Sequence, residues 1–170
     1  DVSDLLPLGV DAFALSFVQR PADLTRLREE ISKHLPATQA PPQLFAKIET
    51  QPAIDNVHAI LDQCDGLMVA RGDMGIEIGL HKVPLVQKRL IAAARERGKV
   101  SITATQMLHT MTNAPVPTRA EVSDIANAVL DGSDMVMLSG ESASGRFPVQ
   151  CVKMMRLVCD EAELGLGPRP

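Results

Sequence analysis

Aromatic residues are almost missing from this sequence, which has no Trp, no Tyr and 4 Phe among its 170 residues. A core must therefore consist of aliphatic residues and methionine, a composition that suits buried parallel strands and their covering helices. The hydrophobic fraction of 45% is typical of a single globular domain. Because the net charge is −4 and no basic stripe or aromatic platform is visible, no nucleic acid partner is expected.

Cysteine is also scarce, and an odd count of 3 without a framework spacing argues against structural disulfides. Cys64, Cys151 and Cys159 are expected as buried or partly buried thiols in a reducing compartment. No apolar run is long enough to span a bilayer, and the first residues lack the charged and apolar regions of a signal peptide. These absences predict a cytoplasmic protein that has no membrane partner.

Five short apolar runs are present instead, each followed by a polar or glycine-containing stretch and then by a helical pattern. They cover residues 12–17, 44–48, 66–70, 100–104 and 135–139. This alternation predicts an α/β fold with a parallel sheet. Five strands fall short of the eight in a closed barrel, so a partial TIM-type (β/α) barrel is expected. A doubly wound open sheet is the alternative.

Helical periodicity is clear between and after these runs. Apolar residues recur at helical spacing after Pro21, within residues 54–61 and 83–91, and after Pro148. Thr118 and Glu121 form a capping box ahead of another helix. We expect one domain over residues 1–163, with residues 164–170 as a tail or linker.

Unusual polar residues lie at the carboxyl end of every predicted strand, where function collects in a β/α barrel. On the second strand, side-chain alternation places Lys47 and Glu49 on the face opposite to Leu44, Ala46 and Ile48. Lys47 and Glu49 would then face the barrel mouth. A structural ion pair is the plain interpretation, but a partly buried pair costs desolvation, and an anionic substrate with a divalent cation would justify that cost.

Asp73 follows the third strand between Gly72 and Gly75, in what reads as a glycine-containing turn. Glycines let the backbone approach a ligand, and exposed amides can hold a carboxylate or phosphate. Because Asp73 and Glu49 come from consecutive strands, their carboxylates could share one Mg²⁺ or Mn²⁺ ion. The alternative for Asp73 is a turn-forming residue.

The fourth and fifth strand ends carry hydroxyl and carboxylate groups. Thr105 could donate a hydrogen bond to a substrate, or could simply cap a helix over the next residues. Ser139 and Glu141 repeat the spacing of Lys47 and Glu49, although Glu141 could instead bond a neighbouring loop. The four histidines share no metal-ligand spacing, so surface positions are expected for them.

The residues at these strand ends make the sequence resemble the pyruvate kinase family. The matching segments are LSFV at 15–18, KIE at 47–49, MVARGDMGIE at 68–77, ATQML at 104–108, PTRAEVSD at 117–124, NAVLDG at 127–132 and MLSGE at 137–141. Several motifs in the family's order, covering nearly the whole chain, make the resemblance specific.

The resemblance implies an enzyme that transfers a phosphoryl group from phosphoenolpyruvate to ADP, giving pyruvate and ATP. It implies that Lys47 stabilises the charge of the phosphoryl group and that Glu49 and Asp73 bind Mg²⁺ or Mn²⁺. The Gly72 and Asp73 amides, with the Thr105 hydroxyl, would hold the substrate carboxylate. These roles agree with phosphoryl transfer as a reaction that depends on positioning and charge neutralisation.

The resemblance also has limits. Ser144 stands where the family has a lysine, which puts a phosphate-side contact in doubt. The family's potassium ligands, its lid domain, part of its nucleotide site and its C-terminal regulatory domain are expected to lie outside this chain. Two alternatives therefore stay open: a fragment or remnant that binds Mg²⁺ and phosphoenolpyruvate without turnover, and a barrel lyase or aldolase. Open barrel edges would favour association or a homo-oligomer.

Overall fold

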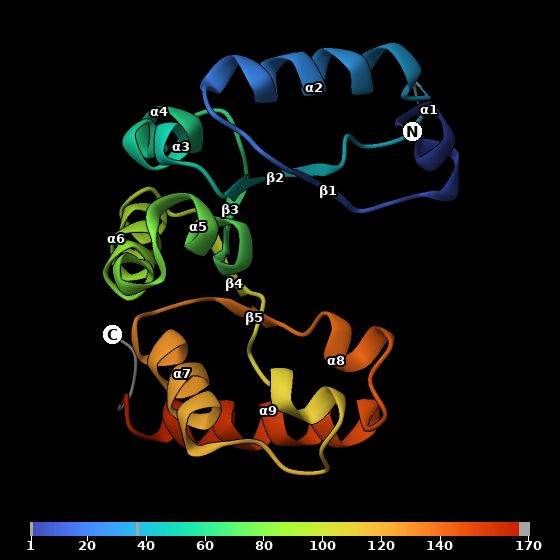
Figure 1. Ribbon diagram of the computed structural model, residues 1–170. Helices are drawn as coiled ribbons and strands as arrows, with labels where there is room; N and C mark the ends of the chain where they lie inside the picture. Colours follow the sequence, from blue (N-terminus) through green and yellow to red (C-terminus); the bar gives the residue numbers. More distant parts are fainter. Residues whose placement is uncertain (1, 37, 167–170) are drawn as a thin grey trace.

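The computed structural model describes residues 2–36 and 38–166, and its centre is a sheet of five parallel strands (Figure 1). The strands lie in chain order, β1-β2-β3-β4-β5. They are β1 (Ala12–Leu15), β2 (Gln43–Ile48), β3 (Gly66–Ala70), β4 (Val100–Ala104) and β5 (Met135–Met137). Chain order with parallel pairing is the arrangement of a β/α barrel, so the doubly wound alternative is excluded.

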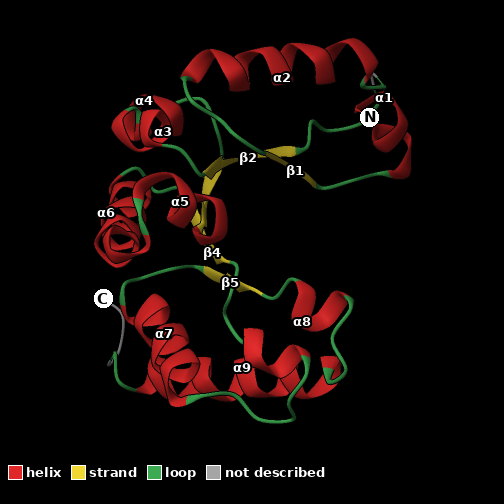
Figure 2. Ribbon diagram, in the orientation of Figure 1, coloured by secondary structure: helices red, strands yellow, loops and turns green. Residues whose placement is uncertain are grey.

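The strands form an arc, and the longer helices lie along its outer side (Figure 2). The α-helices are α1 (Val2–Leu5), α2 (Pro21–His34), α3 (Gln51–Asp55), α4 (Val57–Leu61), α5 (Arg71–Ile78), α6 (Val83–Glu96), α7 (Arg119–Leu130), α8 (Gly140–Ala143) and α9 (Pro148–Leu164). Short 3-10 turns are η1 (Leu6–Leu8), η2 (Leu80–Lys82) and η3 (His109–Thr112). The partial-barrel prediction is confirmed. No described helix is long and apolar enough to cross a membrane.

All five predicted strands are present, and β3 and β4 have the predicted bounds. β1 and β5 are shorter than predicted, because the chain leaves the ladder at the sheet's two edges. The helix predicted over 54–61 is divided at Asn56, whose backbone is not helical (φ −98°, ψ 10°). The tail expected at residues 164–170 begins at the end of α9, and its last four residues lie outside the described part of the chain.

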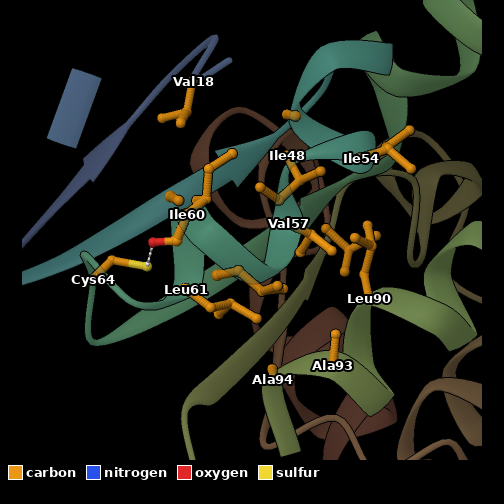
Figure 3. Packing of buried hydrophobic residues seen from close by; sticks show 14 of the residues in the cluster. Val18, Ile48, Ile54, Val57, Ile60, Leu61, Cys64, Leu90, Ala93 and Ala94 are labelled. Atoms are coloured by element: carbon orange, nitrogen blue, oxygen red, sulfur yellow. Dashed lines mark hydrogen bonds between the residues drawn. The ribbon is translucent and has the colours of Figure 1, made fainter. Parts of the chain in front are cut away.

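The main core lies between β1–β3 and helices α2 to α6 (Figure 3). Leu44, Ala46 and Ile48 are fully or nearly fully buried in it, so the predicted alternation along β2 is confirmed. Cys64 belongs to this core, and its thiol donates to the Ile60 carbonyl oxygen over 3.3 Å. The apolar face of β2 thus packs against the helices, and Lys47 and Glu49 lie on its other face.

A second core joins η3, α7 and α9. Its buried members are Met107, Leu108, Met111, Ile125, Ala128, Cys151, Met155 and Val158. Cys151 is buried and Cys159 is partly buried, and all three cysteines are free thiols, as predicted. Burial raises the pKa of each thiol, which keeps them protonated and poorly reactive.

The short helices that follow β3 and β5 were not expected from the sequence. α5 begins directly after β3, so the predicted glycine turn is wrong and both Gly72 and Gly75 lie in a helix. A Cβ on Gly75 would lie 2.6 Å from the end of the Leu80 side chain, which is exposed and would have to turn aside. α8 begins directly after Ser139, so the fifth strand does not extend to Glu141.

The capping box of α7 provides a stability test. The Thr118 hydroxyl accepts from the Glu121 amide (3.2 Å), and the Glu121 carboxylate accepts from the amides of Thr118 (2.8 Å) and Thr110 (2.7 Å). Replacing Thr118 by Ala should lower the free energy of unfolding by about 1 kcal/mol. Chemical denaturation of the chain and of T118A measures this difference.

The same box predicts acid sensitivity. Partial burial raises the pKa of Glu121, but the amides of Thr110 and Thr118 outweigh it and leave the pKa below its ordinary value of 4.5. The carboxylate therefore stabilises the fold above pH 4.5, and this stabilisation is lost as the pH falls through the lowered pKa. Glu121→Gln should flatten that part of the stability–pH curve, whereas the exposed Glu96→Gln should not. Identical curves for both variants would contradict the assignment.

Candidate functional site

Lys47 and Glu49 lie together at the carboxyl end of β2, on the concave face of the sheet. The Lys47 Nζ lies 2.8 Å from Glu49 Oε1 and donates to Ser16 Oγ over 2.7 Å. Ser16 follows β1, the strand paired with β2. A lysine ammonium carries three donors, and Ser16 accepts one of them, so donors remain for a ligand oxygen.

Glu49 is a buried carboxylate with unfilled acceptor capacity. Its side chain is 0% exposed, whereas that of Lys47 keeps 24% exposure. Oε2 accepts from the Phe17 amide over 2.6 Å, whereas Oε1 is paired with the Lys47 ammonium but accepts no hydrogen bond from the described residues. The groups next to this carboxylate are the Lys47 ammonium and the Phe17 amide, so Oε1 can still bind a cation.

Asp73 lies in the first turn of α5, which suits an acidic side chain electrostatically. It is exposed, and the register of the sheet brings its helix close to Glu49. Ile48 pairs with Val69, so Glu49 follows β2 at the level where Ala70 ends β3. The sharing of one cation by Glu49 and Asp73 is consistent with this register, and it stays a prediction.

The carboxylates of Glu49 and Asp73 suit Mg²⁺ better than a metal ion whose ligands all come from protein side chains. Within residues 2–36 and 38–166, no group of three or more His, Cys, Asp or Glu side chains could hold a metal ion. Mg²⁺ binds through one or two carboxylates and takes its other oxygens from water and substrate phosphates. The unfilled Oε1 of Glu49 with an exposed Asp73 nearby matches that requirement.

Gly72 and Thr105 are brought into direct contact. The Gly72 amide donates to Thr105 Oγ1 over 2.8 Å, which joins the start of α5 to the end of β4. Since Oγ1 accepts this bond, its own proton is available to a ligand. A Cβ on Gly72 would make only ordinary contacts, 3.7 Å from Thr105 Oγ1, so packing does not demand glycine here. The glycine instead keeps the backbone open to close approach.

Backbone strain collects at these strand ends. Among the described residues, the non-glycine residues with positive φ are Phe17 (55°), Thr105 (70°) and Gln106 (56°). All lie within two residues of the end of β1 or β4. Because residues 105–108 form bends rather than a helix, the helix-cap interpretation of Thr105 is wrong. Strain of this kind persists only where the surrounding structure holds it, and it is frequent at functional sites.

Arg71 supports this turn, and the sequence analysis did not identify it. Its side chain is buried, and its Nη2 donates to the Thr105 carbonyl oxygen over 2.7 Å. Its Nη1 forms an ion pair with Asp124 of α7 over 2.7 Å. The sequence feature that could have identified Arg71 is the position of this charged residue, between a fully apolar strand and a glycine.

The fifth strand end has a structural role. Glu141 is buried, and its two oxygens accept from the amides of Leu108 (3.2 Å) and Ser139 (2.9 Å). The interpretation of Glu141 as a residue bonding a neighbouring loop is therefore confirmed. The histidines at positions 34, 58, 81 and 109 are exposed, as expected.

Comparison with known families gives a match over most of the chain. The family described as "Pyruvate kinase, barrel domain" matches residues 1–152. The chain is 51% identical over 159 residues to a pyruvate kinase of Bacillus licheniformis, a match that covers 94% of the chain and 27% of the relative. It is 51% identical over 158 residues to pyruvate kinase 2 of Synechocystis, covering 93% of the chain and 26% of the relative.

A solved structure agrees with these matches. The crystal structure of a pyruvate kinase from Cryptosporidium parvum superposes with a TM-score of 0.90 at 43% sequence identity. The match covers 96% of the present chain and 34% of that structure. The chain thus spans about a quarter to a third of the length of the proteins that it matches.

Proposed function

Since the chain belongs to the pyruvate kinase family, through its barrel domain, we propose that it carries the phosphoenolpyruvate half of a pyruvate kinase active site. The proposed reaction moves the phosphoryl group of phosphoenolpyruvate to the terminal phosphate oxygen of ADP, leaving the enolate of pyruvate, which then takes up a proton. The supporting observation is that the Lys47–Glu49 pair and the Gly72–Thr105 contact lie at the carboxyl ends of neighbouring strands, β2, β3 and β4.

Lys47 is proposed as the residue that contacts the phosphoryl oxygens. Ser16 and Glu49 hold its ammonium at the rim of the sheet. This fixes the positive charge before substrate arrives, so little reorganisation is needed when negative charge moves during transfer. The burial of Glu49 keeps the local dielectric low, which strengthens the attraction.

Glu49 and Asp73 are proposed to hold a divalent cation, Mg²⁺ or Mn²⁺. When bound, this cation neutralises charge on the phosphoryl group and on the enolate oxygen. Glu49 Oε1 is the buried oxygen that still lacks a hydrogen bond, and Asp73 would provide a second oxygen from the solvent side. The family also uses K⁺, and we place its ligands outside this chain.

The Gly72 and Asp73 amides and the Thr105 hydroxyl are proposed to bind the substrate carboxylate. The first amides of a helix have no partner within the helix, and they favour an anion. Thr105 accepts from Gly72 and can donate its proton to a carboxylate oxygen. In this conformation the Gly72 amide is held by Thr105, so the Asp73 amide and the Thr105 hydroxyl are the open donors, and the Gly72 amide would join them only by releasing Thr105.

Turnover needs more than this half-site, so the alternative function is binding without transfer. The chain matches about a quarter to a third of its relatives' length, and the proposed nucleotide contacts and potassium ligands lie in the remainder. ADP and ATP as partners, and a cytoplasmic location, stay predictions. A lyase or aldolase site would need the metal and carboxylates but not Lys47.

Calorimetric titration of the chain with phosphoenolpyruvate, with and without Mg²⁺, tests the proposal. We expect binding that requires Mg²⁺ and that is competed by pyruvate. A lactate dehydrogenase-coupled assay with ADP then separates a working enzyme from a binding half-site. No binding of phosphoenolpyruvate at any Mg²⁺ concentration would refute the proposed function.

The sheet edges predict self-association of the chain by itself. Within the described residues, β1 and β5 each pair with one neighbour only, which leaves one unpaired edge on each strand. Unpaired edges recruit further strands, so sedimentation velocity should show concentration-dependent association. Met135, which is 50% exposed on β5, gives a control, because M135K places a charge at that edge and should reduce association. A monodisperse chain at all concentrations would contradict the prediction.

A further inference from the structure

Arg71 is a buried charge whose position the proposed chemistry does not explain. Its side chain retains 8% exposure, although arginine is rarely buried without a partner. It directly follows β3 and begins α5. It does not point to the concave side with Lys47, because its guanidinium reaches the neighbouring strand end and two outer helices.

The guanidinium divides its contacts between two regions. Toward the end of β4, Nε donates to the Ala104 carbonyl oxygen (3.3 Å), and Nη2 donates to the Thr105 carbonyl oxygen (2.7 Å) and to the Met107 sulfur (2.7 Å). Toward the outer helices, Nη1 donates to Gln87 (3.3 Å) and Asp124 (2.7 Å). Residues of α6 and α7 therefore hold the guanidinium in place, and its other nitrogens bind the backbone carbonyl oxygens of residues 104 and 105.

That backbone adopts an unfavourable conformation. Thr105 and Gln106 are consecutive left-handed residues, at φ 70° and 56°, and neither is glycine. L-residues with a Cβ avoid this region, and two in succession need an external constraint. Beyond the turn, Leu108 is held by Glu141 through its amide (3.2 Å). Before it, the carbonyl oxygens of residues 104 and 105 are held by Arg71.

We propose that Arg71 is a positioning residue that holds the Thr105–Gln106 turn in its left-handed conformation. The turn directs the Thr105 hydroxyl oxygen onto the Gly72 amide, 2.8 Å away, and so fixes the position from which Thr105 can donate its own proton to a carboxylate. Lysine cannot replace this function, because a single ammonium cannot reach two carbonyl oxygens and Asp124 together. The inference deepens the proposed function and rests on it for its effect on substrate.

The competing interpretation is a structural ion pair that ties β3 to α7. Two variants distinguish these interpretations. Asp124→Asn weakens the ion pair but leaves the carbonyl contacts of Arg71, whereas Arg71→Lys keeps a positive charge but loses the fork. Arg97→Lys is the matched control, since Arg97 bonds Asp62 (3.1 Å) far from this turn.

Amide hydrogen exchange by NMR gives a readout that needs no ligand. In R71K the Gly72 amide should exchange at least about tenfold faster than in the wild type, from the loss of charged hydrogen bonds. The strong intraresidue amide–Hα NOE of Thr105, which marks positive φ, should weaken. D124N and R97K should change neither signal. Wild-type exchange in R71K, or the same change in D124N, would overturn the proposal.

A second variant covers the case in which R71K does not fold. Gln106 is exposed, and Gln106→Gly relieves strain in the turn without touching the Thr105 hydroxyl. Under the proposal, Q106G restores folding, or the slow Gly72 exchange, in the R71K background. An R71K/Q106G chain that is no better than R71K would contradict it.

Phosphoenolpyruvate affinity measured on the same variants separates this inference from the proposed function. R71K should weaken binding by about tenfold, and Q106G should recover part of the loss. If the wild-type chain binds no phosphoenolpyruvate, the proposed function fails, whereas the exchange measurements still decide the role of Arg71.

Discussion

Replacing Lys47 by Met should weaken the binding of phosphoenolpyruvate by about 100-fold, because a charge-assisted contact with the phosphoryl group is worth roughly 2–3 kcal/mol. The same substitution leaves the Glu49 carboxylate buried without its ammonium. Breaking a buried pair costs about 3–5 kcal/mol. Because Lys47 keeps 24% exposure, we expect a smaller loss of unfolding free energy, about 1–3 kcal/mol.

Mg²⁺ should recover much of that lost stability, since a cation on Glu49 replaces the missing charge. Thermal denaturation with and without Mg²⁺ measures this, and the Mg²⁺-dependent rise in Tm should be larger in K47M than in the wild type. Lys88→Met is the matched control, because Lys88 pairs with Asp131 between α6 and α7. If K47M and K88M respond alike to Mg²⁺ and phosphoenolpyruvate, Lys47 has no special role.

Replacing Asp73 by Asn should reduce the affinity for Mg²⁺ or Mn²⁺ by at least about 100-fold, since even supporting residues of metal sites cost about 10–100-fold. Stability without metal should change by less than about 0.5 kcal/mol, because Asp73 is exposed. Calorimetric titration with each cation, together with denaturation, measures both quantities. A large effect on metal and a small effect on folding is the signature of a ligand.

Glu77→Gln is the control for Asp73, since Glu77 is an exposed carboxylate four residues later on the same helix. It should leave metal affinity within about twofold, as expected for a distant surface charge that salt screens. Glu49→Gln should lower metal affinity as D73N does. Equal, small effects of D73N and E77Q would show that Asp73 acts only through its general charge.

A strand could be predicted accurately where both of its faces are buried, because its residues then form an uninterrupted apolar run. β3 is buried along its whole length, and its bounds were read directly from the sequence. The edge strands were overestimated at positions 16–17 and 138–139, where the sequence stays strand-like. There the chain leaves the ladder, with Phe17 at φ 55° and Ser139 at φ −123°, ψ −104°.

α5 was missed because its sequence contradicts its conformation. Gly72 and Gly75 are poor helix formers and favour a turn. The helix is instead favoured by the burial of Met74 and Ile78 in the main core. That burial depends on how α5 lies against the neighbouring elements, which local propensity does not contain.

Some of the site residues could likewise be predicted from the sequence, and others could not. Lys47 and Glu49 could be paired from side-chain alternation, and Gly72 with Thr105 from the rule that strand ends meet at one edge. The Arg71 network leaves no periodic signal, because its partners lie between 16 and 53 positions away in sequence. Only the three-dimensional arrangement shows that Arg71, beside the proposed metal ligand Asp73, extends toward α6 and α7.

The central claim is that the ends of β2, β3 and β4 form one cation-dependent site. Mn²⁺ substitution with NMR detection tests it most directly, because a paramagnetic ion broadens the amide signals around it. The account predicts that substoichiometric Mn²⁺ first broadens Glu49, Gly72, Asp73 and Thr105, and that D73N removes this effect. Broadening that begins at other carboxylates, such as Asp131 or Asp134, would contradict it.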